Sequence, residues 1–600
     1  MIRIRINFAK KELVIMKIRG FIKRILTGLY NSIRRFPVTI AFSAVVVIMG
    51  IVLLHWDNIN ENTRTFLMRL LMILAMGIPL SLSIRIFFER FRIIKSYFKA
   101  LTYLAGAVFL ILYYFILLKE INLVSGIRYA AVNIALYLCF IFVPYLFKIR
   151  NFEMYVIKLF TRFIITFVYS GVMYGGICAI IFAINKLLGV PISEKIYLDT
   201  LFIVAGIFGT CFFLGGIPAI DEELDENNYP VIFKILVLYI VIPILSAYTM
   251  ILYIYFVKIL ITRQWPNGLV SNLVLWYSMI GIAVLFFISP LKDLVKWVKY
   301  FIFWFSKIIL PLIAMMFVSM GIRLSAYGIT ENRYYVLIMG AWIAAIMIYI
   351  SLKKNTRNII LPVSLAIIAV LSVMGPWSSF SVSEFSQNKR LESILTKYDM
   401  IENNTIIKTK TELPDADKTE ITQIISYFEN SKRLKDVKYL PENYNNSNFE
   451  DEFGFSPTYN YPNLKEPYFY KYLETLDTPI DIKGFDYFFD MKGISNNNTQ
   501  SNKGLTVKFD IPDLDLVINN EDKEIYKRNL LDYADSIYKK YNTADPNTAD
   551  PNALTAADMT FTDQNDKVSV KFLINNISGN NQSGKLIIDT FDFYLFVKIK

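Results

Sequence analysis

The stretch RLSAYGITENRYYVL, residues 323–337, places charged and phenolic side chains between two long apolar runs. Its polar members are Arg323, Tyr327, Thr330, Glu331, Arg333, Tyr334 and Tyr335. Either arginine can pair with the glutamate, or with a carboxylate elsewhere in the chain, through charge-assisted hydrogen bonds. Tyrosines collect where apolar and aqueous surroundings meet, and the threonine can cap a following helix. Three hypotheses stay open: docking of two parts of the chain, anchoring to lipid phosphates, and recognition of a ligand.

Ionisable residues inside apolar runs form a second group of candidates, because burying a charge in lipid is costly. They are Arg69, Arg162, Lys234 and Lys307. Lys307 lies four residues before Pro311 in FWFSKIILPLIAMM, so it can face a polar bundle interior near a kink, or reach the membrane surface. Arg69 and Lys234 lie near the ends of their runs, where a long side chain can reach water.

Catalytic and metal-binding patterns are sparse. Ser378 and Ser379 would need an activating base to act as nucleophiles. Because His55 is the single histidine, the remaining candidate base is Lys307. The acidic loop DEELDE, residues 221–226, lacks the ligand spacing of a calcium loop. All cysteines lie in apolar runs, and no phosphate-cradling glycine loop occurs. We therefore predict no cofactor, metal or catalytic residue, and an enzyme is the least favoured function.

The elements that must position these residues are membrane spans. The chain has 600 residues, of which 55% are hydrophobic and 19% charged, which is too apolar for a soluble protein. Apolar runs near the length needed to cross a bilayer recur about eleven times. They lie near 37–56, 65–84, 100–118, 128–147, 159–184, 198–218, 231–257, 269–290, 301–322, 334–352 and 358–377. Gly171 with Gly175, and in the next span Gly206, Gly209, Gly215 and Gly216, predict close approach between helices.

Basic residues set the expected orientation. Residues 1–36 alternate basic and apolar positions, which predicts an amphipathic cytoplasmic helix lying on anionic lipid. With this end inside, the inside loops hold more Lys and Arg than the outside loops, as cytoplasmic loops do. An odd number of spans then places residues 378–600 outside the cytoplasm, while 37–377 form the transmembrane domain.

Residues 378–600 have the pattern of an ordinary α+β domain. They hold 26 Lys+Arg against 35 Asp+Glu, whereas residues 1–377 hold 37 against 15. Helices are expected at 388–400, 417–430 and 521–541. The alternating segments LTVKFDI, VSVKFLI, KLIID and FDFYLFVKI predict strands. The acidic balance argues against nucleic acid as a partner.

Four motifs carry a family resemblance: RRFPVTIAF at the first span, YGITENRYYVL at 327–337, GPWSSFSVSEFSQNKRL at 375–391 and GFDYFFD at 484–490. They resemble an uncharacterised family of bacterial multi-spanning membrane proteins, labelled domain of unknown function 4153. The resemblance implies an integral membrane protein with a polar C-terminal portion. It supplies no activity, cofactor or catalytic residue.

Two functions fit this organisation of a bacterial cell membrane protein. The first is a transport or cell-envelope assembly component whose outer domain recognises or gates something at the surface. It predicts a polar cavity containing Lys307 or Arg162. The second is a membrane-anchored sensor or scaffold that binds a partner through the outer domain. The expected partners are the lipid bilayer, anionic lipid at the N-terminal helix, and an unknown ligand or protein at the outer domain.

Overall fold

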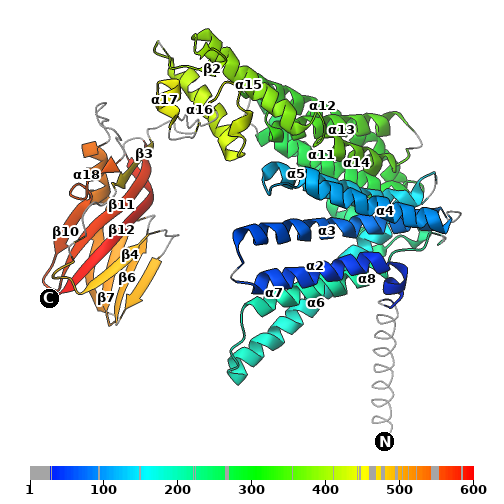
Figure 1. The fold of residues 1–600 in the computed structure, drawn as a ribbon, viewed down its shortest axis with the longest axis horizontal. Helices are drawn as coiled ribbons and strands as arrows, with labels where there is room; N and C mark the ends of the chain where they lie inside the picture. The colour runs from blue at the N-terminus through cyan, green and yellow to red at the C-terminus, as the bar shows by residue number, and fades with distance from the viewer. Residues whose placement is uncertain are drawn as a thin grey trace, which may run out of the picture. The chain divides into compact units, whose positions relative to one another are not determined.

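The chain folds as two compact units, Met1–Thr458 and Tyr459–Lys600. The computed structural model, drawn in Figure 1, describes residue 28 and residues 30–600 with gaps. The gaps are 58, 92–94, 148–150, 221, 223–224, 264–268, 354–355, 410, 442–443, 445–447, 459–467, 475–479, 481, 493–497, 503, 511–512, 522, 542–552 and 583–584. Most of the predicted N-terminal amphipathic helix therefore lies outside the described residues. The predicted boundary at residue 377 marks the end of the apolar runs, and the helices that follow it belong to the first unit.

Ten helical stretches in the described part of the first unit are long and apolar enough to cross a membrane. Their elements are α2 (Pro37–His55), α3 (Glu61–Arg90), α4 with η1 (Ser96–Leu112, Tyr113–Leu117), α5 with η2 (Leu123–Phe142, Val143–Tyr145), α6 (Phe152–Leu188), α7 with η3 and α8 (Lys195–Phe202, Ile203–Gly209, Thr210–Leu214), α9 with η5 and α10 (Val231–Ile235, Leu236–Val241, Ile242–Thr262), α11 with η6 (Leu269–Ile288, Ser289–Leu291), α12 (Lys296–Tyr327) and α13 (Glu331–Leu352). The protein is a polytopic helical membrane protein, as the sequence predicts.

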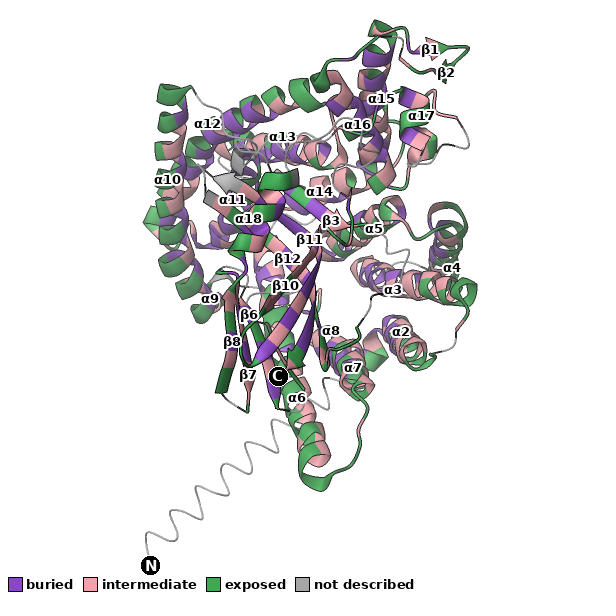
Figure 2. Cartoon of the chain, turned by 90° about the vertical axis from the view of Figure 1, so that its left-hand side faces the viewer, coloured by how far each residue is buried: buried purple, intermediate pink, exposed green. Residues whose placement is uncertain are grey.

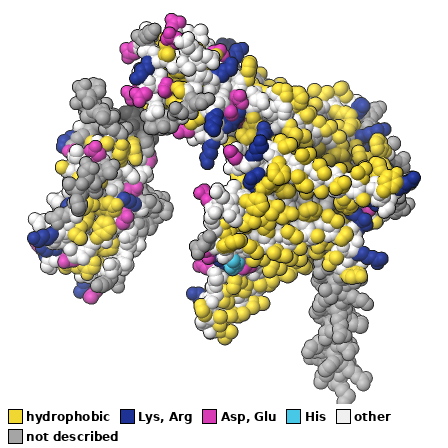
Figure 3. Space-filling view, viewed as in Figure 1, with side chains coloured by type: hydrophobic (Ala, Val, Ile, Leu, Met, Phe, Trp, Pro, Cys, Tyr) yellow, Lys and Arg dark blue, Asp and Glu magenta, His cyan; other side chains and the backbone are white. Residues whose placement is uncertain are grey.

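The outward faces of these helices are apolar. Leu187 and Ile232 are 82% and 86% exposed, and Figure 3 shows hydrophobic side chains covering the visible side of the helices. Figure 2 shows the exposed positions running along α6 and α10. Water would penalise so much exposed apolar surface, whereas lipid does not, so these faces fit a bilayer.

The eleventh predicted span contains a short helix, α14 (Ile360–Leu371). Its 12 residues rise about 18 Å, which is less than a bilayer core. The segment nevertheless runs back along α13. The Arg357 amide donates to the Tyr349 hydroxyl at 2.8 Å, and the Tyr334 hydroxyl donates to the Trp377 carbonyl at 2.6 Å. Residues 357–377 therefore return the chain to the end where α13 begins, although the helix covers only part of the way.

The helix ends form two groups, one at each end of the bundle, and polar contacts join helix ends within each group. At the first end, which we call the basic end, Arg35 pairs with Glu89 at 2.7 Å, and Asn358 donates to Glu153 at 2.7 Å. At the other end, the far end, His55 pairs with Asp199 at 2.7 Å. The chain begins α2 at the basic end and begins the helices after residue 378 at the far end.

Glycines allow close helix approach at some predicted positions and not at others. A Cβ on Gly206 in η3 would lie 2.2 Å from Cγ2 of Val47 on α2. A Cβ on Gly171 or Gly175 would meet nothing within 4 Å among the described atoms. The prediction is therefore confirmed at Gly206 and wrong at Gly171 and Gly175, because helical spacing does not say which face of α6 has a neighbour.

Polar helices complete the first unit. They are α15 (Ser379–Lys397), α16 (Asp415–Asn430), η7 (Leu434–Asp436) and α17 (Phe449–Phe453), with a two-stranded sheet of β1 (Ile401–Glu402) and β2 (Thr405–Ile406). Leu395, Ile424 and Phe428 are buried in their common core. α15 begins nine residues before the predicted helix at 388, because the Ser378 side chain accepts from the Ser381 amide and caps it.

The second unit is built from an antiparallel sheet, a mixed sheet in which, among the described strands, only β3 and β9 pair in parallel, and one helix. One sheet has the strand order β4-β12-β11-β3-β9, with β10 beside β11. It faces a second sheet with the strand order β5-β6-β7-β8. The elements are β3 (Tyr468–Leu473), β4 (Tyr487–Met491), β5 (Asn498–Asn502), β6 (Leu505–Asp510), β7 (Asp515–Asn520), β8 (Lys523–Asn529), α18 (Leu531–Tyr541), β9 (Ala553–Leu554), β10 (Thr560–Gln564), β11 (Val568–Gln582) and β12 (Lys585–Ile599). The rings of Phe509 and Phe593, 5.0 Å apart, join the two sheets.

One predicted helix of this unit is partly wrong. The sequence predicts a helix over 521–541, but residues 523–529 form β8 and only 531–541 form α18. β8 pairs with β7, with Ile518 opposite Tyr526, and both side chains are buried. Pairing with a neighbouring strand therefore overrides the local preference. The four predicted strand segments lie in β6, β11 and β12, the last two merging into one strand.

Replacing Gly206 by alanine tests the close contact with α2. Overpacking against Val47 should lower the free energy of unfolding by about 1–3 kcal/mol, measured on the purified chain in detergent. Gly171→Ala is the matched control, because its Cβ enters open space and alanine favours helix. Equal effects in the two variants would contradict the described packing of η3 on α2.

Candidate functional site

The end of α12 at the far end of the bundle is closed by side chains from α15. The last carbonyls of a helix find no partner within it. Arg390 donates to the Ala326 carbonyl at 3.1 Å and to the Tyr327 carbonyl at 2.7 Å. Gln387 also donates to the Tyr327 carbonyl, at 3.2 Å. Two residues of α15 thus supply the hydrogen bonds that α12 lacks at its C-terminus.

The turn between α12 and α13 is shaped to admit these side chains. Gly328 has φ +64°, and a Cβ there would lie 2.6 Å from Cδ of Arg390. Glycine is therefore required by both conformation and space. The Ile329 amide donates to Ser386 Oγ at 2.9 Å, and Arg333 donates to the Gly328 carbonyl at 2.8 Å. The turn is held from α15 and from the first turn of α13.

An ion cluster lies beside this turn, formed by Glu331, Glu384, Tyr427, Arg433 and Asp436. Arg433 lies 3.4 Å from Glu331, 2.6 Å from Glu384 and 2.6 Å from Asp436. Its side chain is 11% exposed and that of Glu331 is 13% exposed. A single guanidinium thus connects carboxylates from α13, α15 and η7. This geometry suits arginine, whose planar fork offers several donors at once.

The surplus of negative charge in the ion cluster affects its titratable members. Burial, followed by the charge of Asp436, raises the pKa of the Glu384 carboxyl, and Arg433 opposes this shift. Burial, followed by the charge of Glu331, raises the pKa of the Tyr427 phenol, which donates to Glu331 at 2.8 Å. Tyr427 therefore stays a hydrogen-bond donor at physiological pH, and Glu384 takes up a proton at higher pH than an exposed glutamate.

The predicted pairing of charges at this turn is replaced by a different one. Glu331 pairs with Arg433, not with Arg323 or Arg333. Arg333 lies two residues after Glu331 on α13, and residues two apart on a helix do not face each other. It donates instead to carbonyls of the turn, including that of Tyr327 at 2.9 Å. Arg323 is half-buried in the last turn but one of α12.

The predicted tyrosines and the threonine have mixed outcomes. Tyr334 is buried, and its hydroxyl bonds the Trp377 carbonyl, whereas Tyr327 is 45% exposed. The Tyr335 hydroxyl accepts from Ser379 Oγ at 3.2 Å. Thr330 occupies the N-cap position of α13, as predicted, but its side chain makes no capping hydrogen bond.

Lys307 lies in the half of α12 nearer the basic end. Its side chain is exposed, and its Nζ lies 3.7 Å from the centroid of the Phe303 ring, four residues closer to the start of the helix. Ser378 and Ser379 lie at the far end, where they cap α15 and contact Tyr335. About twenty residues of α12 separate Lys307 from that end, so the hypothetical serine–lysine pair is not assembled.

Arg162 makes a structural contact between α6 and the end of α8. It donates to the Phe212 carbonyl at 2.6 Å, and its guanidinium carbon lies 3.9 Å from the Phe212 ring centroid. A Cβ on Gly216 would lie 1.9 Å from Arg162 Nε. The glycine therefore makes room for the arginine, which satisfies a carbonyl in the last turn of α8.

An arginine side chain donates to a carbonyl of another segment at further positions too, where the sequence did not predict this interaction. Arg69 donates to the Leu118 carbonyl at 2.6 Å, just after η1, and Arg128 to the Val373 carbonyl at 3.3 Å, just after α14. Arg35 donates to the Ile217 carbonyl at 2.6 Å. The sequence shows that these arginines lie within a few turns of a span end. It does not show which helix each of them contacts.

Comparison with known proteins places the chain in a family. Residues 33–403 match the family described as Domain of unknown function (DUF4153). The chain belongs to this family. The matched range contains the turn between α12 and α13 and the whole of α15, whereas Tyr427 and Arg433 lie beyond it.

A relative of unknown function is also similar. An uncharacterised protein of Pasteurella multocida is 21% identical over 245 residues, which are 40% of this chain and 42% of that protein. The chain thus matches less than half the length of this relative. No solved structure matches the chain. Among the described residues, no group of three or more His, Cys, Asp or Glu side chains could hold a metal ion.

Replacing Arg433 by glutamine tests the ion cluster. Glu331 would keep a buried charge without its cation, so the free energy of unfolding should fall by about 3 kcal/mol. Limited proteolysis of the full chain should also cut faster within residues 378–458. The double variant Glu331→Gln with Arg433→Gln should recover part of the loss.

Lys408→Gln is the matched control, because its pair with Asp451 is 3.7 Å long and both side chains are mostly exposed. It should change the free energy of unfolding by less than about 1 kcal/mol. An Arg433 variant that behaves like this control would show that the ion cluster does not hold the polar helices to the bundle.

Proposed function

We propose that this multi-pass membrane protein is a transport or assembly component of the bacterial cell envelope. In this proposal, residues 378–600 recognise a ligand or protein outside the cytoplasm, and the recognition is coupled to the membrane helices. The observation that carries it is the contact of α15 with the ends of α12 and α13. Arg390 and Gln387 of α15 bind the last carbonyls of α12, and Arg433 binds Glu331 of α13.

The coupling follows from how these contacts are distributed. Packed elements move as rigid bodies, and small shifts at one site are amplified by bistable contacts elsewhere. α15 holds the C-terminus of α12 and, through Arg433 and Glu384, the N-terminus of α13. A displacement of the polar helices would therefore act on both membrane helices at once. Anchoring alone would need neither contact.

A face of the second unit supports recognition. Phe488 on β4 pairs in register with Phe596 on β12, so their side chains share a sheet face with Tyr594, two residues away. Phe488 is 53% exposed, and its ring lies 5.4 Å from that of Tyr594. Lys492 Nζ lies 4.2 Å from the Tyr594 ring centroid. Aromatic side chains are enriched at protein interfaces.

A membrane-anchored sensor or scaffold is the second candidate. The placement of Arg162 and Lys307 favours it over conduction through the bundle. Arg162 satisfies a carbonyl of α8, and Lys307 lies on an exposed face of α12. A polar path containing either residue would support transport instead. Envelope assembly is compatible with both placements, so it is the form of the first function that we prefer.

The proposal requires residues 378–600 to lie outside the cytoplasm, and cysteine labelling tests this. Lys389→Cys on α15 should react with a membrane-impermeant maleimide in cells whose inner membrane is intact. Lys95→Cys, at the start of α4 on the basic end, should react only after permeabilisation. Both positions are exposed, and the unmodified chain is the background control. The reverse labelling pattern would refute the orientation.

A complementation experiment tests the recognition role. Deleting the chromosomal copy in the native host should increase sensitivity to envelope stress, and the wild-type chain should restore resistance. Phe488→Ala should fail to restore it while reaching the membrane in normal amounts. Leu531→Ala is the matched control, because Leu531 is 40% exposed on α18. Full complementation by Phe488→Ala would remove the aromatic face from the proposal.

A further inference from the structure

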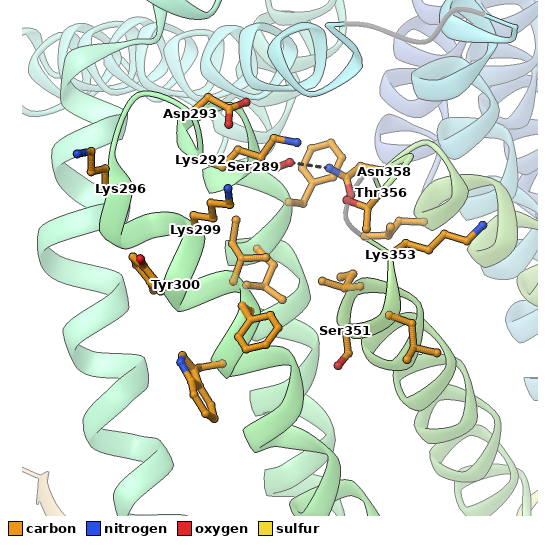
Figure 4. Close-up of a pocket in the computed structure, with 18 residues that line it drawn as sticks. Ser289, Lys292, Asp293, Lys296, Lys299, Tyr300, Ser351, Lys353, Thr356 and Asn358 are labelled. Carbon is orange, nitrogen blue, oxygen red and sulfur yellow. Dashed lines mark hydrogen bonds between the residues drawn. The ribbon is translucent and has the colours of Figure 1, made fainter.

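A large cavity in the described part of the first unit lies at the basic end, away from the α12–α13 turn. It encloses about 1120 Å³ between the ends of α11 and α13 and the start of α12. Its rim carries Lys292, Lys296, Lys299 and Lys353, with Asp293 as the acidic member of the lining. Figure 4 shows Lys292 and Lys299 reaching into the space between α12 and residues 356–358, whereas Lys296 and Lys353 point away from it. Positive charge therefore exceeds negative charge at the mouth.

The polar side of the cavity is a fixed structure. Asn358 is 5% exposed, and its Nδ2 donates to Glu153 at 2.7 Å and to Ser289 Oγ at 3.0 Å. The start of α12 faces the same space. Its N-cap residue is Val295, whose side chain makes no capping hydrogen bond. The Val298 amide donates to the Val295 carbonyl at 3.0 Å, which leaves the amides of Lys296 and Trp297 for another acceptor. Lysines and a helix N-terminus both favour an anion.

The walls change character with depth. Along α12 the lining passes from Lys296 and Lys299 to Phe303 and Trp304 over about 12 Å. At the end of α13 it passes from Lys353, just beyond the helix, to apolar Ile350. Trp304 is 58% exposed on the outward face of the helix, where acyl chains of a bilayer would lie. A ligand filling this space would need a charged end at the rim and an apolar body below it.

We propose that this cavity binds a membrane amphiphile through its phosphate headgroup, with the phosphate between Lys292 and Lys299 and the acyl chains along Trp304. The volume of about 1120 Å³ lies just above the roughly 300–1,000 Å³ of small-molecule sites, which are mostly apolar with a few placed polar groups. Free phosphate shares the headgroup chemistry but would leave the apolar walls unused. The inference is independent of the proposed function, because it concerns the opposite end of the bundle from α15.

Lipid titration of the full chain in a zwitterionic detergent tests the proposal. Phosphatidylglycerol binding is followed by native mass spectrometry, with thermal unfolding as a check that each variant is folded. Lys292→Gln with Lys299→Gln should bind phosphatidylglycerol roughly 25-fold more weakly, about fivefold for each lysine lost. If that double variant fails to fold, Lys299→Gln alone should bind roughly fivefold more weakly.

Lys95→Gln with Lys99→Gln is the matched control, because both lysines are exposed at the same end and outside the cavity. It should leave phosphatidylglycerol affinity within about twofold of the wild type, a difference too small to signal loss of a contact. An equal loss in the two double variants would mean a general surface attraction and overturn the site. Binding of inorganic phosphate as tight as that of phosphatidylglycerol would overturn the assignment to an amphiphile.

Discussion

Carbonyl groups at the ends of membrane helices need hydrogen-bond donors, and in this protein arginines from neighbouring elements supply many of them. Arg162 serves the end of α8, Arg69 the end of η1, and Arg390 the end of α12. Lipid offers no donor, so an unsatisfied carbonyl near the apolar core is expensive. Arginine is well suited to this task, because it stays charged and reaches two carbonyls at once. Each such contact also fixes one helix against another.

The far end of the bundle shows this constraint in its most developed form. The apolar course of α12 ends at Tyr327, and the chain turns back through Gly328, a position that only glycine fits. The carbonyls exposed by this turn are bound from α15, which belongs to the polar part of the chain. The polar helices are thus bonded directly to the membrane helices and are not joined to them by the chain alone. They complete the hydrogen bonding of the membrane helices, and this is why the coupling between them is central to the proposed function.

The two ends of the bundle differ in what their charges do. At the far end, Arg433 and its three carboxylates are largely satisfied by one another, with side chains of Arg433 and Glu331 mostly buried. At the basic end, Lys292 and Lys299 face a cavity whose deeper walls are aromatic. Buried pairs specify how elements fit together, whereas cations facing an open space attract a ligand. The far end accordingly has a structural role, and the basic end is where we propose the binding site.

The sequence by itself determined which segments are suited to lipid and which to water. Runs of apolar residues located ten of the spans, and alternating patterns located β6, β11 and β12, because hydropathy and its period are properties of neighbouring residues. It also pointed to residues 323–337 as a polar site, and to the family. Tertiary structure decided which groups meet. Glu331 found Arg433, about a hundred residues away, and Gly206 rather than Gly171 met a neighbouring helix.

The short α14 and the conversion of residues 523–529 into β8 were decided in the same way, by packing of α14 against α5 and pairing of β8 with β7. The physical reason is that solvation acts residue by residue along the chain, whereas a carbonyl, a guanidinium or a glycine acquires its role only from the element that folding brings beside it.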